Sequence, residues 1–274
     1  MPRKTRVLRM DCLAIIPARY ASSRFPGKLL AAVAGKPLIE HVVTLAVGVP
    51  GLDVVVVATD DERIAEGARN AGADVVLSSD DYASGTDRVA AVAARYPADV
   101  IVNIQGDELL LDTDAVGRAI ERFRDADLRL GTLRTPLTER QDLWDPNVVK
   151  VVIDDNERAL YFSRSPVPFP RAEWQAAMAD GAEAGWPSGL SAARGAAQPG
   201  TWVHLGVYMY RADALRRWAE LPPSPLETAE GLEQLRVLEA GEHMQTYLIN
   251  EAVPGVNTPD DLHRAEAALA ARAR

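Results

Sequence analysis

The chain has 274 residues, of which 47% are hydrophobic and 25% charged, a composition typical of a globular protein with one large core or two unequal lobes. The formal net charge of -9 at pH 7 argues against nucleic acid or an anionic membrane surface as a partner. A single cysteine, Cys12, excludes an intrachain disulfide and is typical of a reducing compartment, and we expect it to be a small buried side chain.

The first segment, residues 1–11, is basic, and we expect it to be a solvated tail. The apolar stretch that follows ends at Pro17, which makes it too short for the core of a signal peptide. No run in the sequence approaches the ~18 apolar residues of a membrane span. The sequence therefore predicts a cytoplasmic protein with no membrane partner.

A basic loop follows the first predicted strand, Cys12 to Ile16, which is a short apolar run. The loop carries four cations among Pro, Ser and Gly residues, namely Arg19, Arg24, Lys28 and Lys36. No acidic residue occurs between residues 12 and 36. Because cations and loop amides both favour an anion, this loop is a candidate phosphate site. An acidic protein with one basic loop suits a small anion, such as a nucleotide.

Strand and helix patterns then alternate as far as residue 104. Apolar residues at helical spacing predict helices over Pro37–Val47, Asp60–Ala71 (with Asp60 as its cap) and Ser84–Tyr96. β-Branched runs predict strands over Asp53–Ala58, Asp74–Leu77 and Asp99–Ile104. This alternation implies a parallel sheet with right-handed crossovers.

The second half of the chain is richer in strands. Strands are predicted over Leu128–Pro136, Val148–Ile153, Ala159–Phe162, Thr201–Tyr210 and Met244–Ile249. Helices are predicted over Arg211–Leu221, Leu226–Ala240 and Thr258–Ala271, the last with Thr258 as its cap. Residues 181–200, rich in Gly, Ala, Ser and Pro, predict a loop or flexible lid.

Several common site motifs are absent from the sequence. Neither the dinucleotide pattern GxGxxG after the first strand nor the Walker pattern GxxxxGK[ST] occurs, which excludes an ordinary P-loop ATPase or a hydride-transfer enzyme. The four histidines and one cysteine form no zinc spacing, and no GxSxG elbow is present.

A second informative stretch is VNIQGDE, residues 102–108. Asp107 follows a buried strand and so lies at the carboxyl end of the predicted parallel sheet, where open α/β folds bind ligands. A carboxylate beside a polyphosphate would hold Mg²⁺, which takes oxygen ligands. Asp107 could equally cap a following helix, and the residues alone leave both roles open.

The motifs in their order resemble one known family. The order is IPAR-x4-R-x2-GK, ATDD, SGTDR, NIQGDE, ALYFSRSPVP, HLGVYMYR, SPLExxExLEQLRVLExG and PGVNTPDDL. From Ile15 to Leu262 the chain is similar to the 3-deoxy-manno-octulosonate cytidylyltransferases, also called CMP-Kdo synthetases. The resemblance implies Mg²⁺-dependent transfer of CMP from CTP to the 2-hydroxyl of a 3-deoxy-2-ulosonic acid, with release of pyrophosphate. The cysteine expected to be buried and the lack of a base-activated serine predict direct in-line attack with no covalent intermediate.

The resemblance also implies a fold and a division of the chain. The fold is α/β and Rossmann-like, with a mainly parallel central sheet flanked by helices and a smaller strand-rich subdomain for substrate binding and dimerisation. Residues 12–274 then form one nucleotidyltransferase domain. Its CTP-binding half is 12–127, its acceptor-binding half is 128–257, and a C-terminal helix spans 258–272. A homodimer is expected.

The resemblance assigns residues to each part of the reaction. It implies that Arg19, Lys28 and Asp107 are catalytic. The nucleotide-binding residues implied are Arg19, Ser22, Arg24, Lys28, Ser79, Ser84, Gly85 and Arg88. The acceptor-binding residues implied are Gln105, Arg164, Arg171, His204, Tyr208, Glu233 and Gln234. His204 and Tyr208 are expected on one side of a strand because of their even spacing, Glu233 and Gln234 in a helix, and Arg164 on the acceptor carboxylate. Asp107 and Asn257 are the implied Mg²⁺ ligands.

The sequence departs from the family pattern at several positions. Asn257 stands where the family has a metal-binding Asp, and Tyr82 where it has His. Further departures are Leu109, in the CTP-binding half, and Val203 and the Thr228-Ala229 pair in the acceptor half. The sequence thus keeps two alternatives open. One is cytidylyl transfer to a different anionic acceptor, such as a modified ulosonate or a phosphonate acid, and the other is a non-catalytic nucleotide-binding homologue.

Overall fold

The computed structural model describes residues 10–21, 25–78, 82, 84–138, 140–169, 171, 202–250, 252–253, 255–256 and 259–272. The chain divides into two compact units. Unit 1 comprises residues 1–131, 206–221 and 252–274, and unit 2 comprises residues 132–205 and 222–251. Unit 1 is therefore assembled from three separate stretches of the sequence.

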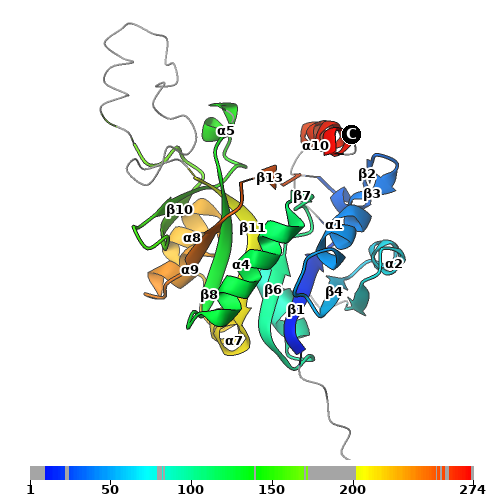
Figure 1. Cartoon of the computed structure of the whole chain (residues 1–274), viewed down its shortest axis with the longest axis horizontal. Helices are drawn as coiled ribbons and strands as arrows, with labels where there is room; N and C mark the ends of the chain where they lie inside the picture. The colour runs from blue at the N-terminus through cyan, green and yellow to red at the C-terminus, as the bar shows by residue number, and fades with distance from the viewer. Residues whose placement is uncertain are drawn as a thin grey trace, which may run out of the picture. The chain divides into compact units, whose positions relative to one another are not determined.

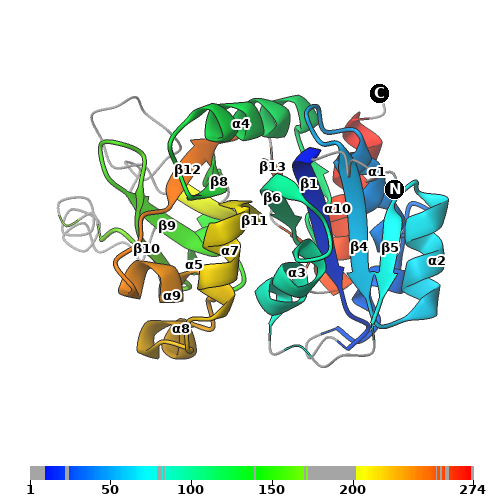
Figure 2. The ribbon, with the colours of Figure 1, turned by 90° about the horizontal axis from the view of Figure 1, so that it is seen from below.

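Unit 1 contains a sheet with the strand order β11-β6-β1-β4-β5 (Figure 2). The strands are β1 (Met10–Ala18), β4 (Val54–Thr59), β5 (Asp74–Leu77), β6 (Ala98–Ile104) and the part of β11 (Trp202–Arg211) that lies in unit 1. β1, β4, β5 and β6 are parallel, whereas β11 runs antiparallel to β6. The predicted parallel sheet of the first half is confirmed.

The helices of unit 1 are α1 (Leu38–Val47), α2 (Glu62–Asn70), α3 (Gly85–Ala93), α4 (Thr113–Asp125), α7 (Ala212–Ala219) and α10 (Pro259–Arg272). Its short elements are the 3-10 helix η1 (Lys28–Leu30) and strands β2 (Ala32–Val33), β3 (Lys36–Pro37), β7 (Leu110–Leu111) and β13 (Ala252–Val253). Right-handed crossovers place α1 and α2 on one face of the sheet and α3 on the other (Figure 2). The face changes because the strand after β5 is β6, which lies on the far side of β1 in the strand order (Figure 1).

Two helix caps test the sequence predictions. Ser84, the first residue of the helix predicted over 84–96, caps α3, because its Oγ accepts a hydrogen bond from Asp87 N at 3.1 Å. The prediction that Asp60 caps α2 is wrong, since the cap is Asp61, which accepts from Arg63 N and Ile64 N. The carboxylate of Asp60 instead accepts from the Arg88 guanidinium at 3.0 Å.

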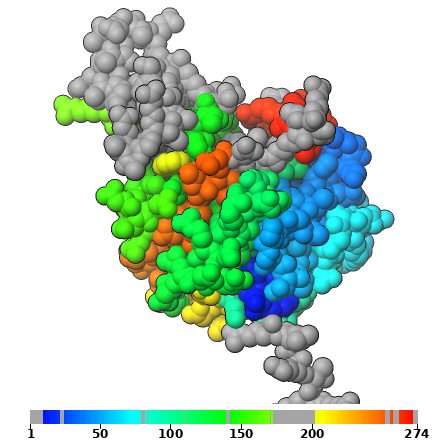
Figure 3. Space-filling model, in the orientation of Figure 1, coloured from blue at the N-terminus to red at the C-terminus, as the bar shows by residue number. Residues whose placement is uncertain are grey.

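Helix α4 has no counterpart among the predicted elements. Asp112 caps it, and its apolar face is buried through Val116, Ile120 and Phe123. Gly117 interrupts that face and weakens the helical signal, but the backbone needs it, because a Cβ there would lie 3.0 Å from Pro50. Figure 3 shows the exposed surface of α4, in green, beside that of the blue segment that contains α1.

Unit 2 is built around antiparallel strands, as the strand-rich second half predicts. Its strands are β9 (Lys150–Ile153), β10 (Ala159–Ser163), β12 (Gln245–Leu248) and the unit 2 parts of β8 (Leu130–Pro136) and β11. β9 pairs antiparallel with both β10 and β11, and β8 pairs with β12. Leu137, Leu143, Val148 and Val203 form a buried apolar cluster.

The helices of unit 2 are α5 (Arg140–Trp144), α8 (Pro225–Glu230) and α9 (Leu235–Glu239). The single helix predicted over Leu226–Ala240 is wrong, because two helices occupy that stretch. Gly231, with φ of 63°, ends α8 in the left-handed conformation that glycine adopts at little cost. Helix α9 then packs against β10 (Figure 2).

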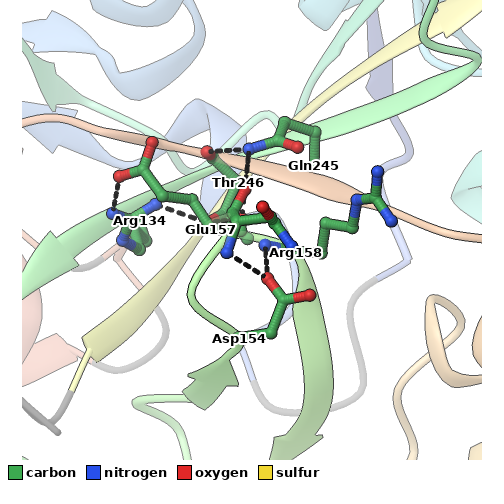
Figure 4. A network of polar contacts seen from close by, with 7 residues as sticks. Arg134, Asp154, Glu157, Arg158, Gln245 and Thr246 are labelled. Atoms are coloured by element: carbon green, nitrogen blue, oxygen red, sulfur yellow. Dashed lines mark hydrogen bonds and ion pairs between the residues drawn. The ribbon is translucent and has the colours of Figure 1, made fainter.

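A polar network ties β8, the β9–β10 hairpin and β12 together within unit 2 (Figure 4). The buried Arg134 guanidinium donates to Glu157 Oε1 at 2.5 Å and to Thr246 Oγ1. Thr246 Oγ1 donates in turn to Glu157 O at 2.7 Å. Asp154 Oδ1 accepts from Arg158 N at 2.8 Å and closes the hairpin turn.

Strand β1 is deeply buried in unit 1. Residues 12–16 are inaccessible to solvent, and burial together with the Asp53 carboxylate raises the pKa of Cys12 to about 12. Cys12 is thus the small buried side chain that the sequence predicts. Among the described residues, no helix combines the length and the apolar character needed to span a bilayer.

Candidate functional site

The basic loop leaves β1 at the carboxyl edge of the parallel sheet. Arg19 follows the strand directly and is exposed. Gly27 turns the chain back with φ of 70°, and its N–H donates to Tyr20 O at 3.2 Å. This turn places Lys28 at the start of η1. Ser22 and Arg24, both predicted to bind nucleotide, lie outside the described residues.

Lys28 joins three separate stretches of unit 1. Its Nζ donates to Asp107 Oδ2 at 2.7 Å and to Val256 O at 2.9 Å. Val256 N donates to Asp107 O at 3.1 Å. The carboxyl ends of β1 and β6 therefore meet at this ion pair, as expected for neighbouring parallel strands. Asn257, the predicted second metal ligand, follows Val256 but lies outside the described residues.

The geometry excludes one of the two roles that the sequence leaves open for Asp107. The residue caps no helix, because β7 follows it and Asp112 caps α4. The alternative of a helix cap is therefore wrong. The Asp107 carboxylate is instead paired with a lysine at the edge of the sheet, with 23% of its side chain exposed and 13% of the Lys28 side chain exposed.

Glu108 fixes the loop that carries Asp107. Its Oε1 accepts from Gly206 N at 2.5 Å, while Gln105 N donates to Gly206 O at 2.9 Å. Burial and the neighbouring Asp107 raise the pKa of Glu108 to about 8. Its Oε2 is buried and finds no hydrogen-bond partner among the described residues.

Gly206 completes this arrangement because it has no side chain. A Cβ at that position would lie 2.7 Å from Glu108 Oε1 and 3.0 Å from Gln105 Cγ. Neither Glu108 nor Gly206 is among the predicted site residues. Two signals point to them, namely the carboxylate that directly follows Asp107 and a glycine in the middle of the strand HLGVY.

The start of α3 lies beside the same edge of the sheet. The position of a Cβ on Gly85 is 3.6 Å from Gln105 Oε1 and 3.8 Å from Pro17 Cγ. Arg88 is buried, pairs with Asp60 at 3.0 Å and lies over the Tyr82 ring at 5.1 Å. Unit 1 thus gathers Lys28, Gln105, Asp107 and the α3 N-terminus. Ser79 lies outside the described residues.

The chemistry of the donors fits a hard divalent cation. Asp107 supplies carboxylate oxygens, which are ligands that Mg²⁺ prefers. The same carboxylate already binds a positive charge, because it forms an ion pair with Lys28 Nζ. Within the part of the chain that the structure describes, no three His, Cys, Asp or Glu side chains are grouped to hold a metal.

In unit 2, Arg164 is directed at backbone carbonyl groups. Nε donates to Glu230 O at 2.6 Å, Nη1 to Pro146 O at 2.7 Å and Nη2 to Gly231 O at 3.1 Å. The guanidinium thus joins the turn at Pro146 to the C-terminal end of α8. Its predicted contact with an acceptor carboxylate stays a prediction.

His204 is held at the start of β11, in unit 2. Its Nε2 lies 2.9 Å from Thr132 Oγ1, and its ring makes an edge contact with Phe162 at 4.9 Å between centroids. Burial lowers the pKa of His204 to about 3, so the imidazole is neutral at pH 7. His204 and Tyr208 occupy half-buried positions that alternate with buried ones along β11, which confirms that they share a side of the strand.

The remaining predicted acceptor residues occupy different surroundings. Glu233 and Gln234 lie in the turn between α8 and α9, so their predicted place in a helix is wrong, because Gly231 interrupts the helix before them. Gln234 is buried. Arg171 is exposed, and Tyr208, in unit 1, packs against Tyr210 and Trp218.

Comparisons with known proteins agree on one family. A family model described as cytidylyltransferase matches residues 13–244. The 3-deoxy-manno-octulosonate cytidylyltransferase of Syntrophotalea carbinolica is 46% identical over 261 residues, covering 95% of this chain and 99% of that protein. The enzyme of the same name from Geobacter sulfurreducens is 44% identical, covering 93% of this chain and 98% of that protein.

Solved structures agree with the sequence relatives. A CMP:2-keto-3-deoxy-manno-octonic acid synthetase complexed with CTP is similar with a TM-score of 0.79 and 36% identity, covering 96% of this chain and 99% of that one. A putative glucose-1-phosphate thymidylyltransferase from Bacillus anthracis, 17% identical with a TM-score of 0.63, shares the fold and covers 94% of each chain. The predicted α/β nucleotidyltransferase fold is confirmed.

Proposed function

Since the chain belongs to the 3-deoxy-manno-octulosonate cytidylyltransferase family and is a cytidylyltransferase, we propose that it transfers CMP from CTP to the 2-hydroxyl of Kdo and releases pyrophosphate. One observation supports this most directly. Lys28 from the basic loop and Asp107 from the QGDE loop meet at 2.7 Å, although 79 positions separate them in the sequence. The two motifs that the reaction requires are thereby brought to one edge of the sheet.

The chemical problem is electrostatic. An oxygen of an anionic acid attacks the α-phosphorus, and negative charge develops on the departing pyrophosphate. Lys28 Nζ, now held by Asp107, would exchange that carboxylate for a phosphate oxygen, and Arg19 would add a bidentate contact. This exchange leaves the oxygens of Asp107 available to hold Mg²⁺. Bound there, Mg²⁺ supplies Lewis-acid neutralisation of the phosphate charge.

We assign nucleotide recognition to the start of α3. The α3 N-terminus adds backbone donors, and Ser84 and Gly85 are small enough to let a pyrimidine approach. Gln105 lies beside Gly85 and would contact the acceptor near the α-phosphate. In unit 2, His204, Glu233 and Gln234 would contact acceptor hydroxyls. We also expect a homodimer, which size-exclusion chromatography with light scattering would show.

The proposed reaction needs no covalent intermediate. Cys12 is fully buried and its thiol is held protonated, so it cannot act as a nucleophile. Direct in-line attack then inverts the configuration at the α-phosphorus. Turnover of a chiral α-phosphorothioate CTP measures this, and retention of configuration would contradict direct transfer.

The central experiment is an assay of pyrophosphate release. We expect release only when CTP, Mg²⁺ and Kdo are all present, with no release when ATP or UTP replaces CTP. Omission of each component in turn provides the controls. Turnover of other anionic acids without turnover of Kdo would show that the acceptor proposed here is wrong, while the cytidylyl transfer stands.

A second acceptor is favoured by a specific group of residues. Asn257, Leu109, Val203 and the Thr228-Ala229 pair all depart from the family pattern around the acceptor and the metal. An acceptor panel of Kdo, amino-substituted ulosonates and phosphonate acids, compared by kcat/KM, separates the two proposals. Robust turnover of any acceptor removes the third alternative, a non-catalytic homologue.

A further inference from the structure

Two segments of unit 2 are joined by hydrogen bonds that residues 161–164 donate and residues 230–231 accept. From the end of β10, Ser163 Oγ donates to Glu230 Oε1 at 2.7 Å and Arg164 N to Glu230 Oε2 at 2.9 Å. Tyr161 OH donates to Glu230 Oε1 at 3.4 Å. The Arg164 side chain grips the backbone carbonyls of Glu230 and Gly231. We call Tyr161, Ser163, Arg164, Glu230 and Gly231 the β10–α8 clamp.

The hydrogen bonds of the clamp stabilise the charged form of the Glu230 carboxylate. The Glu230 carboxylate is only partly buried, and the hydrogen bonds from Arg164 N and Ser163 Oγ outweigh the burial that opposes ionisation, so the pKa of Glu230 lies below its usual range. Glu230 is therefore ionised at neutral pH and accepts from several donors at once. Such charge-assisted hydrogen bonds are stronger than neutral ones.

A second set of contacts joins the two helices on either side of the turn over residues 231–235. Arg236 binds Glu227 through two hydrogen bonds, Nε to Oε2 at 2.6 Å and Nη2 to Oε1 at 2.5 Å. Gly231 N donates to Glu227 O at 2.7 Å. The Glu227–Arg236 pair therefore fixes the internal shape of the turn over residues 231–235, while the clamp fixes where the turn lies against β10.

We propose that Glu230 is a positioning residue for the acceptor, because it anchors to β10 the turn in which Glu233 and Gln234 lie. This inference rests on the proposed function, in which these two residues contact the acceptor. Arg164 then acts on the acceptor through the turn, since its guanidinium reaches the carbonyls of Pro146, Glu230 and Gly231. The internal Glu227–Arg236 pair does not replace the clamp, because neither residue contacts β10 in the hydrogen bonds described above.

The test compares Glu230→Gln and Arg164→Lys with the wild type in kinetics and in hydrogen exchange. A glutamine at 230 replaces one acceptor oxygen by a donor group that opposes Ser163 Oγ or Arg164 N. We expect KM for Kdo to rise about tenfold, with KM for CTP within twofold of the wild type. Amide exchange over residues 231–235 should accelerate about tenfold.

A matched control separates positioning from general loss of stability. Val151→Ala removes buried apolar volume from β9 in the same unit, at a position whose strand partners, Phe162 and Trp202, are not members of the clamp. We expect it to lower the unfolding midpoint and to leave KM for Kdo unchanged. The double variant of Glu230→Gln and Arg164→Lys should resemble the worse single variant, because both changes open the same clamp.

Three results would overturn the proposal. The first is unchanged KM for Kdo in Glu230→Gln, and the second is an equal rise in both KM values. The third is a rise for Arg164→Lys without faster exchange over 231–235, which would show direct binding of the acceptor by Arg164. If the wild type itself fails to turn over Kdo, the proposed function is wrong, and the exchange rates alone then decide whether the clamp positions the turn.

Discussion

At a place where no side chain fits, Gly206 donates its N–H to Glu108 Oε1 and accepts at its C=O from Gln105 N. A Cβ would lie 2.7 Å from Glu108 Oε1, a separation that requires the loop to shift. Because that loop carries Asp107, we expect Gly206→Ala to lower kcat more than tenfold while the protein still folds. The measurement is the rate of pyrophosphate release at saturating CTP and acceptor.

Gly48→Ala is the control for the Gly206 variant. Gly48 ends α1 with φ of -79°, a backbone conformation that alanine adopts, and the nearest atoms to a Cβ there belong to Leu45, Thr44 and Thr113, none of which is a site residue. We expect its activity to remain within twofold of the wild type. Full activity in Gly206→Ala would show that the loop tolerates the shift and that its position is not critical.

Lys28 is the second residue whose loss should be costly. Its Nζ is the only group in the hydrogen bonds described here that contacts both Asp107 and the segment before residue 257. Removal of a charge-stabilising donor of this kind costs about 3–4 kcal/mol in the transition state. We therefore expect Lys28→Ala to reduce kcat/KM for CTP by about two to three orders of magnitude, measured under steady-state conditions. A reduction below tenfold would contradict the triphosphate assignment.

Individual residues of the site were predictable where chemistry and spacing suffice. Lys28 and Asp107 follow from a basic loop and a carboxylate that both end parallel strands. Glu108 and Gly206 were missed, because their role depends on β11, which joins β6 from a position about 100 residues later in the chain. The contacts of Arg164 with backbone carbonyls also depend on distant turns and leave no pattern in the sequence.

The β9–β10 hairpin depends on one side chain at its turn. Glu157 pairs with Arg134, whose side chain is only 3% exposed, and loss of the carboxylate leaves that buried guanidinium short of an acceptor. Glu157 has φ of 62°, so Glu157→Ala keeps the backbone strain and removes the carboxylate that pairs with Arg134. We expect the free energy of unfolding to fall by about 2 kcal/mol, measured by urea denaturation.

Arg158→Ala serves as the comparison for this change. In the network of Figure 4, Arg158 takes part through its backbone N–H and carbonyl, and the substitution leaves those in place. We expect the free energy of unfolding of this variant to stay within about 0.5 kcal/mol of the wild type. Equal losses in both variants would indicate that the pair of Glu157 with Arg134 contributes nothing specific.

Strand β11 contains a group that should make stability depend on pH. Burial lowers the pKa of His204 to about 3, whereas the unfolded chain binds the proton near the ordinary pKa of about 6.5. Between these values the unfolded state holds more protons, so stability falls as the pH drops below 6.5. The slope from this group reaches at most about 1.4 kcal/mol per pH unit.

Urea denaturation at pH 7, 6 and 5 tests the effect of His204. The wild type should lose more stability over this range than His204→Gln, which carries no titrating group at that position. The difference between the two curves isolates this imidazole from the carboxylates that titrate in the same range. Parallel curves would show that His204 is protonated as readily in the folded chain as in the unfolded one.

Helices and strands were predicted best where their pattern of apolar residues is clearest. The β-branched runs of β4 and β6 gave strands within two residues of their observed bounds. Helix α4 was missed because Gly117 breaks its apolar face, and the single helix expected over 226–240 was wrong because Gly231 takes the left-handed conformation. In both cases a glycine required by packing or by a turn overrides the local pattern.

The whole molecule offers a test of nucleotide binding that does not depend on the acceptor. A ligand present at 100 times its Kd stabilises the folded state by about 2.7 kcal/mol. We expect CTP with Mg²⁺ to raise the midpoint of thermal unfolding despite the net charge of -9, because the basic loop offsets that charge locally. ATP should give a smaller shift, and Lys28→Ala should lose most of the shift. Equal shifts with CTP and ATP would contradict cytosine recognition at the start of α3.

The arrangement of the chain has a consequence for any attempt to express the nucleotide half alone. A fragment that ends at residue 131 contains β1, β4, β5 and β6 but lacks β11, which pairs with β6 through residues 207–211. The unpaired edge of β6 would present backbone donors and acceptors beside the apolar residues Ile101, Val102 and Ile104, a combination that favours aggregation. We expect such a fragment to remain soluble only when residues 206–221 are added as a second peptide, which a fragment-complementation experiment would test.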